Sequence, residues 1–547
     1  MKRNEPKITI VTRKNGRKYA YRAVEHRWNP EKKSCETKLE YYGTVDDEGN
    51  VIPKRMRMVK AAVVESGDDD LHLLSSKRIG LTRVMWRIAE ETGLTECLKD
   101  AFPQTWRTIL SLAMYHASTG SNAAYLFPEW HKSHELPIHD DDLSGQDISR
   151  LYSGMDGARR KEFLLGWRKK ASTGGACFHD ITSISSYSKD NELVEYGYNR
   201  DGENLPQVNL GMIVDSGNRL PIYYRVHDGA IPDVSTLQSV LREGCSFNYS
   251  KLTFVMDKGF FSTANVSAMY GHGYHFIQAM TLASSKTREA MDEALRSRIR
   301  HPRNIIRTDN GQLLYAMGIK SHWNAEGMHR DCLIHVYAQS VADINLRTSS
   351  LDIRLAECYE ELNAGKFLNS HAALYARYFK EIEKEDGSRH YEYNEEHIEG
   401  RETKYAGLFA IVTDRMDLSS TDVMNVYRDK DGVEKIFNDI KNVQDCRRLS
   451  VHTRQAMDGR VFVVFLASIL IAEMRQRLKG CKDREELTID LVRKTLDKVS
   501  VSYVRRDGKR KHVQLYSDLT GKQTLLLSSL LKVKPADVEK ILKEILV

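Results

Sequence analysis

The sequence predicts an α/β domain that is interrupted by an insertion, with a small β module and a helical region before it and a helical segment after it. Three observations along the chain support this order. Residues 174–282 contain several apolar strand-like runs, residues 283–400 are rich in charge, and an apolar strand-like run returns at residues 407–414. With 547 residues, the chain is long enough for two to four domains with sizeable cores.

The first 173 residues are expected to form two modules. Residues 1–70 contain short alternating runs, as in KITIVTRKNGRKYAYRAVEHRW, where Asn15-Gly16 fits a hairpin turn, so we expect a β module. Residues 71–173 carry apolar side chains at three- and four-residue spacing in LTRVMWRIAEETGLTECL and WRTILSLAMYHA, which is typical of helices. A helix-turn-helix fits this pattern, but a generic helical bundle is the commoner source of it.

Residues 174–282 are expected to hold the first part of the α/β domain. ACFHDITSI predicts a buried strand, VNLGMIVD and LPIYYRVH predict two strands around a Gly217-Asn218 turn, and PDVSTLQSVLREG predicts a helix. KLTFVMDKGFF then predicts a short apolar strand that ends in a carboxylate. The order is strand, strand, strand, helix, strand, with Asp180 on the first strand and Asp257 at the end of the fourth.

The rest of the chain divides into three parts. Residues 283–400 have few long apolar runs and are expected to be an insertion domain. Residues 401–480 resume the α/β domain with the apolar strand GLFAIVTD, and residues 481–547 predict a C-terminal helical segment. The most apolar run, Val461 to Ala472, is too short to cross a bilayer comfortably and is expected to be a buried core helix.

The composition is that of an ordinary globular protein. The chain has 82 basic and 75 acidic residues, and its formal net charge of +7 permits an anionic partner without requiring one. Basic clusters at residues 159–161, 168–170 and 505–511 are candidate nucleic-acid contacts, although such runs are usually solvated surface.

The eight cysteines are scattered without a C-x-x-C pair, and MKRNEPKITI does not have the pattern of a secretory signal. A reducing cytoplasm is therefore expected, without a disulfide framework or zinc knuckles.

A helix is expected around YRDKDGVEKIFNDIK, with a polar stripe in which one acidic residue lies among cations. Ser419, followed three residues later by Asp422, fits an N-terminal cap for a helix over residues 420–443. One face of this helix is apolar, and a polar stripe of roughly 60° lies apart from it. The stripe contains Tyr427, Lys430, Glu434 and Lys441. A helix on the solvated surface would carry similar acid–base pairs. Whether this stripe is solvated surface or one wall of an active site therefore depends on carboxylates elsewhere in the sequence.

Two carboxylates on strands and one on this helix indicate a metal-dependent site. Asp180 lies in an apolar strand, where an ionised carboxylate is costly unless it is paired or bound to a metal ion. Mg²⁺ prefers oxygen ligands, and two such ions can activate an attacking oxygen and stabilise a leaving oxygen in phosphodiester chemistry. The candidate catalytic residues and metal ligands are Asp180, Asp257 and Glu434. The candidates to contact DNA phosphates without reading bases are Tyr427, Lys430 and Lys441.

These residues also carry a family resemblance. The spacing Y-x2-K-x3-E-x6-K, from Tyr427 to Lys441, resembles the Y-x2-R-x3-E-x6-K signature of DDE transposases of the insertion sequence 4 type, in particular the branch named for insertion sequence 1634. HDITSI and VMDKGFF are similar to that family's first-Asp and second-Asp motifs. The resemblance covers about residues 174–475, and residues 283–400 fall where these enzymes carry an insertion. Lys430 departs from the signature arginine, since it keeps the charge but loses the two-pronged hydrogen bonding.

The resemblance implies a catalytic core of ribonuclease-H-like fold and a DNA transposase that excises and integrates an insertion sequence by cut and paste. It implies hydrolysis and strand transfer with Mg²⁺, for which Mn²⁺ can substitute. The implied partners are double-stranded DNA with terminal inverted repeats, target DNA, and a second copy of the chain in a homodimer on the DNA. The helical residues 71–173 would help to recognise the repeats. The implied location is the cytoplasm, at a bacterial or archaeal nucleoid, with no membrane contact.

Two other functions fit parts of this pattern. A metal-dependent nuclease of the same fold would share the carboxylates but lack strand transfer. A domesticated, non-catalytic DNA-binding protein would descend from a transposase, but the presence of all three acids argues against it.

Two aromatic residues are also open to two interpretations. His179 is more simply a packed histidine than a ligand, and Trp323 is more simply a core residue than a base-stacking platform.

Overall fold

The computed structural model describes residues 8–12, 18–29, 34–45, 51–53, 71–138, 143–244, 252–325, 327–383, 389–399, 405–481, 487–506 and 512–545. The chain divides into two compact units, Met1–His72 with Arg505–Lys511, and Leu73–Val504 with His512–Val547. The expected turn at Asn15-Gly16 and most of the last basic cluster lie outside the described residues.

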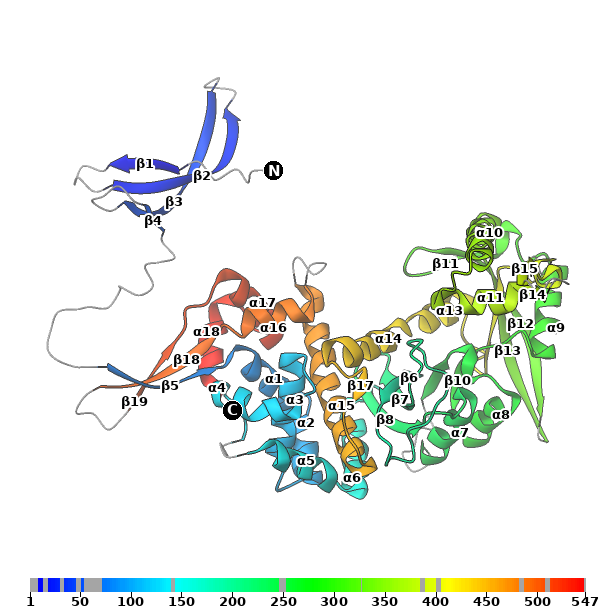
Figure 1. Ribbon diagram of the computed structural model, residues 1–547, viewed down its shortest axis with the longest axis horizontal. Helices are drawn as coiled ribbons and strands as arrows, with labels where there is room; N and C mark the ends of the chain where they lie inside the picture. Colours follow the sequence, from blue (N-terminus) through cyan, green and yellow to red (C-terminus); the bar gives the residue numbers. More distant parts are fainter. Residues whose placement is uncertain are drawn as a thin grey trace. The chain divides into compact units, whose positions relative to one another are not determined.

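The first unit contains an antiparallel sheet with the strand order β1-β2-β3-β4 (Figure 1). Its strands are β1 (Ile8–Thr12), β2 (Lys18–Asn29), β3 (Ser34–Val45) and β4 (Val51–Pro53). The ring of Tyr41 lies 6.1 Å from that of Tyr19 and 5.8 Å from that of Tyr21, across the β2–β3 pair. Cross-strand aromatic contacts of this kind stabilise antiparallel pairs.

The second unit begins with a set of helices. These are α1 (Gly80–Glu91), α2 (Leu94–Ala101), α3 (Trp106–Thr119), α4 (Phe127–Ser133), α5 (Gly145–Gly154) and α6 (Gly157–Ala171). Gly93 separates α1 from α2 with a φ of 77°, a left-handed conformation that glycine adopts without a steric penalty. The indoles of Trp86 and Trp106 stack at 6.2 Å between α1 and α3. The helical periodicity of the sequence in this region is therefore confirmed.

The C-terminal residues pack on this helical region. They form α16 (Ile489–Leu496), β18 (Ser500–Arg506), β19 (His512–Tyr516), α17 (Gly521–Leu531) and α18 (Val538–Glu544). The strands join β5 (Leu71–Arg78) in a three-stranded sheet of order β19-β18-β5. The expectation of an entirely helical C-terminal segment is wrong at these two strands, because their pairing partner β5 comes from the other end of the chain.

A mixed sheet forms the centre of the second unit. Its first five strands in sequence are β6 (Ala176–Ser186), β7 (Gln207–Asp215), β8 (Pro221–Asp228), β9 (Thr253–Met256) and β10 (His275–Ala279). They lie in the order β10-β9-β6-β7-β8, in which β6, β7 and β8 are antiparallel and β6, β9 and β10 are parallel. The helices α7 (Asp233–Gly244) and α8 (Thr263–His272) follow β8 and β9. The expected order of strand, strand, strand, helix, strand is confirmed.

The sheet continues into the region that was expected to be an insertion. β10 pairs with β16 (Leu408–Thr413), which pairs on its other side with β13 (Met328–Ala338). β12 (Leu313–Ala325) and β11 (Ile305–Arg307) complete this side, and α9 (Ser285–Arg296) precedes them. These residues therefore extend the α/β sheet instead of standing apart from it, because pairing with β16 satisfies the backbone groups of β13.

The remaining part of this region has a small core of its own. It consists of α10 (Val341–Asn363), α11 (Ala372–Tyr378), β14 (Phe379–Glu383), β15 (Arg389–Tyr393) and α12 (Glu395–Glu399). The buried cluster contains Leu355, Cys358, Leu362, Tyr378 and Phe379. We call the stretch from α10 to α12 the α10–α12 segment.

The long helix α15 (Arg454–Arg477) connects the helical region with the sheet (Figure 1). Phe462 packs against Phe102 and Phe163 of the helical region, and Phe465 packs against Tyr224 of β8. Because α15 contacts protein on both sides, its apolar run is buried, as the sequence predicted. In the part of the chain that the structure describes, there is no helix with the length and apolar character needed to cross a membrane.

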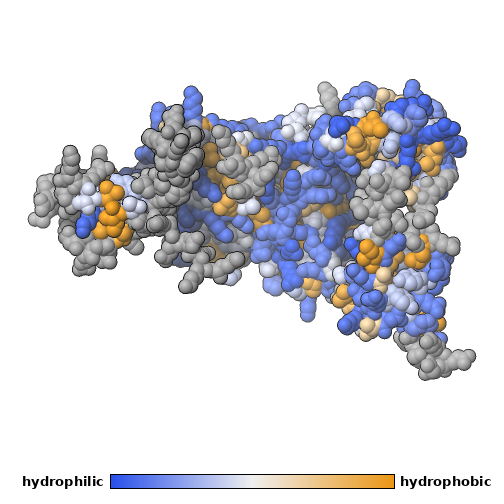
Figure 2. Space-filling view, turned by 90° about the horizontal axis from the view of Figure 1, so that it is seen from above, coloured by the Kyte–Doolittle hydropathy of each residue, from blue (hydrophilic) through white to orange (hydrophobic). Residues whose placement is uncertain are grey.

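The face of the molecule in Figure 2 is mainly hydrophilic, and its apolar side chains gather only in small groups.

Candidate active site

Asp180 of β6 and Asp257, which directly follows β9, lie side by side, because β6 and β9 are adjacent parallel strands. Cys177 and Phe178 of β6 pair with Phe254 and Val255 of β9, and the same register continued by two residues brings Asp180 beside Asp257. Both side chains point to the same face of the sheet, because side chains alternate along each strand. The two carboxylates recognised in the sequence are therefore brought together by strand pairing.

Asp180 has a desolvated carboxylate. Its Oδ1 accepts a hydrogen bond of 2.8 Å from the backbone N–H of Ile181. Burial raises the pKa of Asp180 to about 6, and the negative charge of Asp257 acts in the same direction, whereas Lys430 and Arg200 oppose the rise. A nearby cation stabilises the ionised form of a buried carboxylate such as this one.

Asp257 has cationic and phenolic partners. Its Oδ1 accepts hydrogen bonds from the Tyr427 hydroxyl at 2.9 Å and the Lys258 backbone N–H at 2.7 Å, and its Oδ2 lies 3.0 Å from Lys430 Nζ. Burial alone would raise the pKa of Asp257, but the charge of Lys430 and these hydrogen bonds outweigh it, so the pKa falls below its ordinary value. Gln278 fixes the backbone of Asp257, since its buried amide donates a 2.7 Å hydrogen bond to the Asp257 carbonyl oxygen.

Glu434 comes from a helix that is packed on the sheet. Ser419 and Asp422 form the expected capping box at the start of α13 (Ser420–Arg428). The single helix expected over residues 420–443 is instead α13, a short break, α14 (Asp431–Asn438) and a π-helical turn, Asp439–Val443. The expected apolar face is confirmed by the buried side chains of Val433, Ile436, Phe437 and Ile440.

Tyr427 lies near all three carboxylates and is hydrogen-bonded to Asp257. Burial raises its pKa, and the negative charges of Asp257, Asp180 and Glu434 add to the rise. Lys430 is 11% exposed and lies 3.0 Å from Asp257 and 4.0 Å from Glu434, so its ammonium sits between these two acids. Glu434 itself is 62% exposed. The structure thus gathers Asp180, Asp257, Glu434, Tyr427 and Lys430 at one place.

Lys441 forms its ion pair with another acid, Asp201. Its Nζ lies 2.8 Å and 2.7 Å from the two carboxylate oxygens of Asp201, and the lysine is only 10% exposed. Asp201 and the neighbouring Arg200 belong to the connection between β6 and β7, in the stretch YNRDGEN. Our sequence reasoning missed both residues, although the charged stretch in the connection that follows the strand of Asp180 could have indicated them.

The two aromatic residues with open interpretations are both packed in the core. His179 is fully buried, its Nδ1 lies 3.3 Å from the Met212 carbonyl oxygen, and burial lowers its pKa to about 4. Trp323 is 2% exposed, and its indole N–H donates a 3.3 Å hydrogen bond to Ser267. The simpler interpretation is confirmed for each.

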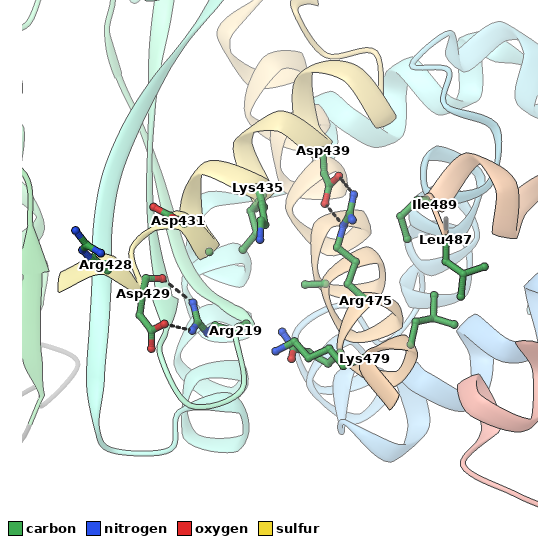
Figure 3. Close-up of a pocket in the computed structure, with 15 residues that line it drawn as sticks. Arg219, Arg428, Asp429, Asp431, Lys435, Asp439, Arg475, Lys479, Leu487 and Ile489 are labelled. Carbon is green, nitrogen blue, oxygen red and sulfur yellow. Dashed lines mark hydrogen bonds and ion pairs between the residues drawn. The ribbon is translucent and has the colours of Figure 1, made fainter. Parts of the chain in front are cut away.

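A groove lies on the far side of α14, between this helix and α15 (Figure 3). Gly432 leaves room there for Arg219, since a Cβ at this position would lie 2.6 Å from the guanidinium. Arg219 is paired with Asp429 at 2.7 Å, and Arg475 is paired with the buried Asp439. Much of the charge in this groove is therefore neutralised by internal ion pairs that fix α14 in position.

The comparison with known families agrees with this geometry. A family model described as a transposase DDE domain matches residues 173–470, which is more than half of the 547 residues. The chain therefore belongs to the DDE transposases. It is a DNA transposase, an enzyme with DNA as its partner, and such enzymes generally use divalent metal ions.

A solved structure of the piggyBac transposase, described as a synaptic complex with hairpin DNA, is similar to this chain with a TM-score of 0.36 and 11% sequence identity. The similarity covers 86% of this chain and 83% of that chain. None of the curated proteins matches the chain.

Proposed function

We propose that this transposase excises and integrates an insertion sequence by cut and paste, through metal-dependent phosphodiester hydrolysis and strand transfer at terminal inverted repeats. We assign it to the insertion sequence 4 type, in the branch named for insertion sequence 1634, on the spacing of Tyr427, Lys430, Glu434 and Lys441. The observation that carries the proposal is the register of β6 and β9, which places Asp180 beside Asp257 under the helix that bears Glu434. A ribonuclease-H-like core is supported by the mixed sheet and by the position of the first acid on a central strand.

The proposed metal ligands are Asp180, Asp257 and Glu434, with Mg²⁺ as the ion and Mn²⁺ as a substitute. The donor set fits, because all three are hard oxygen ligands and the buried Asp180 has a raised pKa that a cation would lower. When bound, such ions activate the attacking oxygen and stabilise the leaving oxygen of a phosphodiester.

The chain's own residues prepare this site in two ways. Tyr427 and Lys430 hold the Asp257 carboxylate ionised and fixed in direction, through contacts of 2.9 Å and 3.0 Å. Lys430 also neutralises part of the charge between Asp257 and Glu434, which lowers the repulsion within the metal-free site. As an ammonium beside the acids, it is placed to contact a DNA phosphate when the phosphodiester enters.

The other DNA contacts are proposed to come from Tyr427, Lys441 and the helical residues 71–173, with the last recognising terminal repeats. Lys441 would exchange its partner Asp201 for a phosphate, since both are anionic oxygen acceptors. We also propose a homodimer that holds two element ends, acting in the cytoplasm on the DNA of a bacterial or archaeal nucleoid.

The test is a cleavage and joining assay with the purified full-length protein on DNA taken from both flanks of its gene. We expect cleaved ends and end-to-target joined products with Mg²⁺, and neither product after chelation. Asp180→Ala, Asp257→Ala and Glu434→Ala should each abolish both products while end binding is retained, and the double variants should be no worse. Cleavage without joining would favour a nuclease, and end binding without cleavage would favour a non-catalytic DNA-binding protein.

A further inference from the structure

A second group of metal-binding side chains lies in the α10–α12 segment. One ligand atom each from Cys358, Glu361 and His371 lies within 4.8 Å of the others. Cys358 and Glu361 are three residues apart on α10, so they share one face of that helix. His371 is the last residue of the short 3-10 helix Asn369–His371, just before α11. In the described part of the chain, no other group of three such residues meets this distance.

We propose that Cys358, Glu361 and His371 bind a zinc ion, with a water molecule as the fourth ligand. A thiolate, an imidazole and a carboxylate together suit zinc, which takes sulfur, nitrogen and oxygen ligands in a tetrahedral arrangement. The proposal is independent of the transposition chemistry, because these residues are distinct from the three active-site acids.

The geometry requires little movement. Tetrahedral zinc places its ligand atoms roughly 3.5 Å apart. His371 Nδ1 already lies 2.8 Å from Glu361 Oε2, and the three ligand atoms span no more than 4.8 Å, so binding requires shifts of only roughly 1 Å. His371 and Glu361 are 20% and 19% exposed, which leaves a route for the ion from solvent.

The hydrogen bonds around Glu361 orient its carboxylate as they would orient a metal ligand. The Tyr375 hydroxyl donates to the same Glu361 oxygen that contacts His371, and such an outer partner orients a ligating carboxylate. Cys358 is fully buried, and its sulfur lies beside these polar groups, within 4.8 Å of a ligand atom of each of Glu361 and His371. A hydrogen-bonded trio of Glu361, His371 and Tyr375 would not need this thiol at all.

A metal ion would also give this segment stability that its own core does not supply. Among the described residues, the separate core contains five buried side chains, one of which is Cys358 itself. Segments with so little apolar core are usually stabilised by a disulfide or a structural metal. Zinc would join the C-terminal end of α10 to the start of α11. The site was not recognised in the sequence because it has one cysteine and no C-x-x-C pair.

The experiment uses the full-length protein, purified without chelator. We expect about one zinc ion per chain by elemental analysis. After zinc is removed and Co²⁺ is added, a sulfur-to-cobalt charge-transfer band should appear, which oxygen ligands at the active site cannot produce. Cys358→Ser should abolish this band, and His371→Ala and Glu361→Gln should weaken zinc binding at least tenfold.

The matched control is Cys332→Ser, which removes another fully buried cysteine, on β13, and should leave the band unchanged. Tyr375→Phe removes the outer hydrogen bond and should weaken binding much less than His371→Ala does. A wild-type protein without the band, or a Cys358→Ser variant that keeps it, would overturn the proposal. If Cys358→Ser does not fold, unchanged zinc affinity in both His371→Ala and Glu361→Gln would do the same.

Discussion

The Tyr427 hydroxyl donates a 2.9 Å hydrogen bond to Oδ1 of Asp257, and this contact connects α13 to the end of β9. Tyr427 comes three residues before Lys430, whose ammonium contacts the other oxygen of the same carboxylate. Both donors lie at the end of α13 and in the break that follows it, so the direction of the Asp257 side chain depends on where this stretch lies. The spacing of Tyr427, Lys430 and Glu434 in the sequence therefore has a structural meaning. The first two residues orient the Asp257 carboxylate, and the third is itself the candidate third acid.

Tyr427→Phe should slow DNA cleavage without unfolding the protein. The substitution removes one hydrogen bond to a carboxylate, and hydrogen bonds to charged groups contribute about 1.5–3 kcal/mol. We expect cleavage at limiting Mg²⁺ to fall by roughly tenfold or more, with partial recovery at high Mg²⁺. The control is Tyr196→Phe, which removes the hydroxyl of a side chain that is 68% exposed and should have no effect. Equal cleavage rates for Tyr427→Phe and wild type at every Mg²⁺ concentration would exclude this role.

Asp180→Asn should stabilise the metal-free protein at neutral pH. The pKa of Asp180 is raised from 3.8 to about 6, so the folded state holds this proton more tightly than the unfolded chain does. The contribution of this group to stability is therefore full below pH 3.8 and is lost as the pH rises through about 6. The amide does not titrate, so the variant should exceed wild type at pH 7 by roughly 1–3 kcal/mol and match it near pH 4.

The measurement is urea unfolding in EDTA at several pH values between about 4 and 7. Added Mg²⁺ should stabilise wild type at pH 7 and leave Asp180→Asn nearly unchanged, because only the carboxylate binds the ion well. A stability gap that does not vary with pH would show that Asp180 is not responsible for it.

The sequence predicted those parts of the site that depend on local periodicity. The apolar side of Val433, Ile436 and Phe437 follows from helical spacing, and it is buried on the sheet as expected. The strand positions of Asp180 and Asp257 follow from the apolar residues around them. That the two acids would lie level was not visible, because it depends on the register between two strands far apart in the chain.

Contacts between distant segments explain what the sequence did not predict. Lys441 shares a helical stripe with Glu434 on an ideal helix, but the break between α13 and α14 and the π-helical turn change that geometry. Its partner Asp201 comes from another connection and could not be inferred from spacing. In the same way, β18 becomes a strand because β5, at the opposite end of the chain, offers an edge for pairing. Pairing of this kind leaves little signal in a single segment.

Arg477→Met should destabilise the contact between α15 and its neighbours. The guanidinium is 1% exposed and lies 2.8 Å from Glu473 and 2.8 Å from Glu91 of α1, and it donates to the Leu530 carbonyl oxygen of α17. Removing it leaves Glu473 and Glu91 with only their more exposed partners Lys532 and Arg87, and it leaves the Leu530 carbonyl oxygen without its donor, so we expect a cost of about 1–3 kcal/mol. The matched control is Lys540→Met, which breaks an exposed pair at 3.9 Å with Glu544 and should cost nearly nothing. Equal unfolding midpoints for the two variants would contradict the prediction.

Glu434→Gln should separate catalysis from DNA binding. The amide keeps the shape of the side chain but removes the charge that a divalent ion needs. We expect the variant to bind element ends as wild type does and to give no strand transfer. Because Glu434 is 62% exposed, the substitution should leave the unfolding midpoint within experimental error. Strand transfer near the wild-type level would remove Glu434 from the site.

Lys441→Ala and Asp201→Asn should have opposite effects on DNA binding if Lys441 contacts a phosphate. In the structure the lysine is bound by Asp201, so Asp201→Asn releases the ammonium for DNA, whereas Lys441→Ala removes it. We expect Lys441→Ala to weaken end binding and to reduce the slope of log affinity against log salt by about one unit, because one fewer counterion is released. Asp201→Asn should bind the ends as tightly as wild type or more tightly. If the pair is only structural, both variants should lower the unfolding temperature alike, and neither should change the salt slope measured by fluorescence anisotropy.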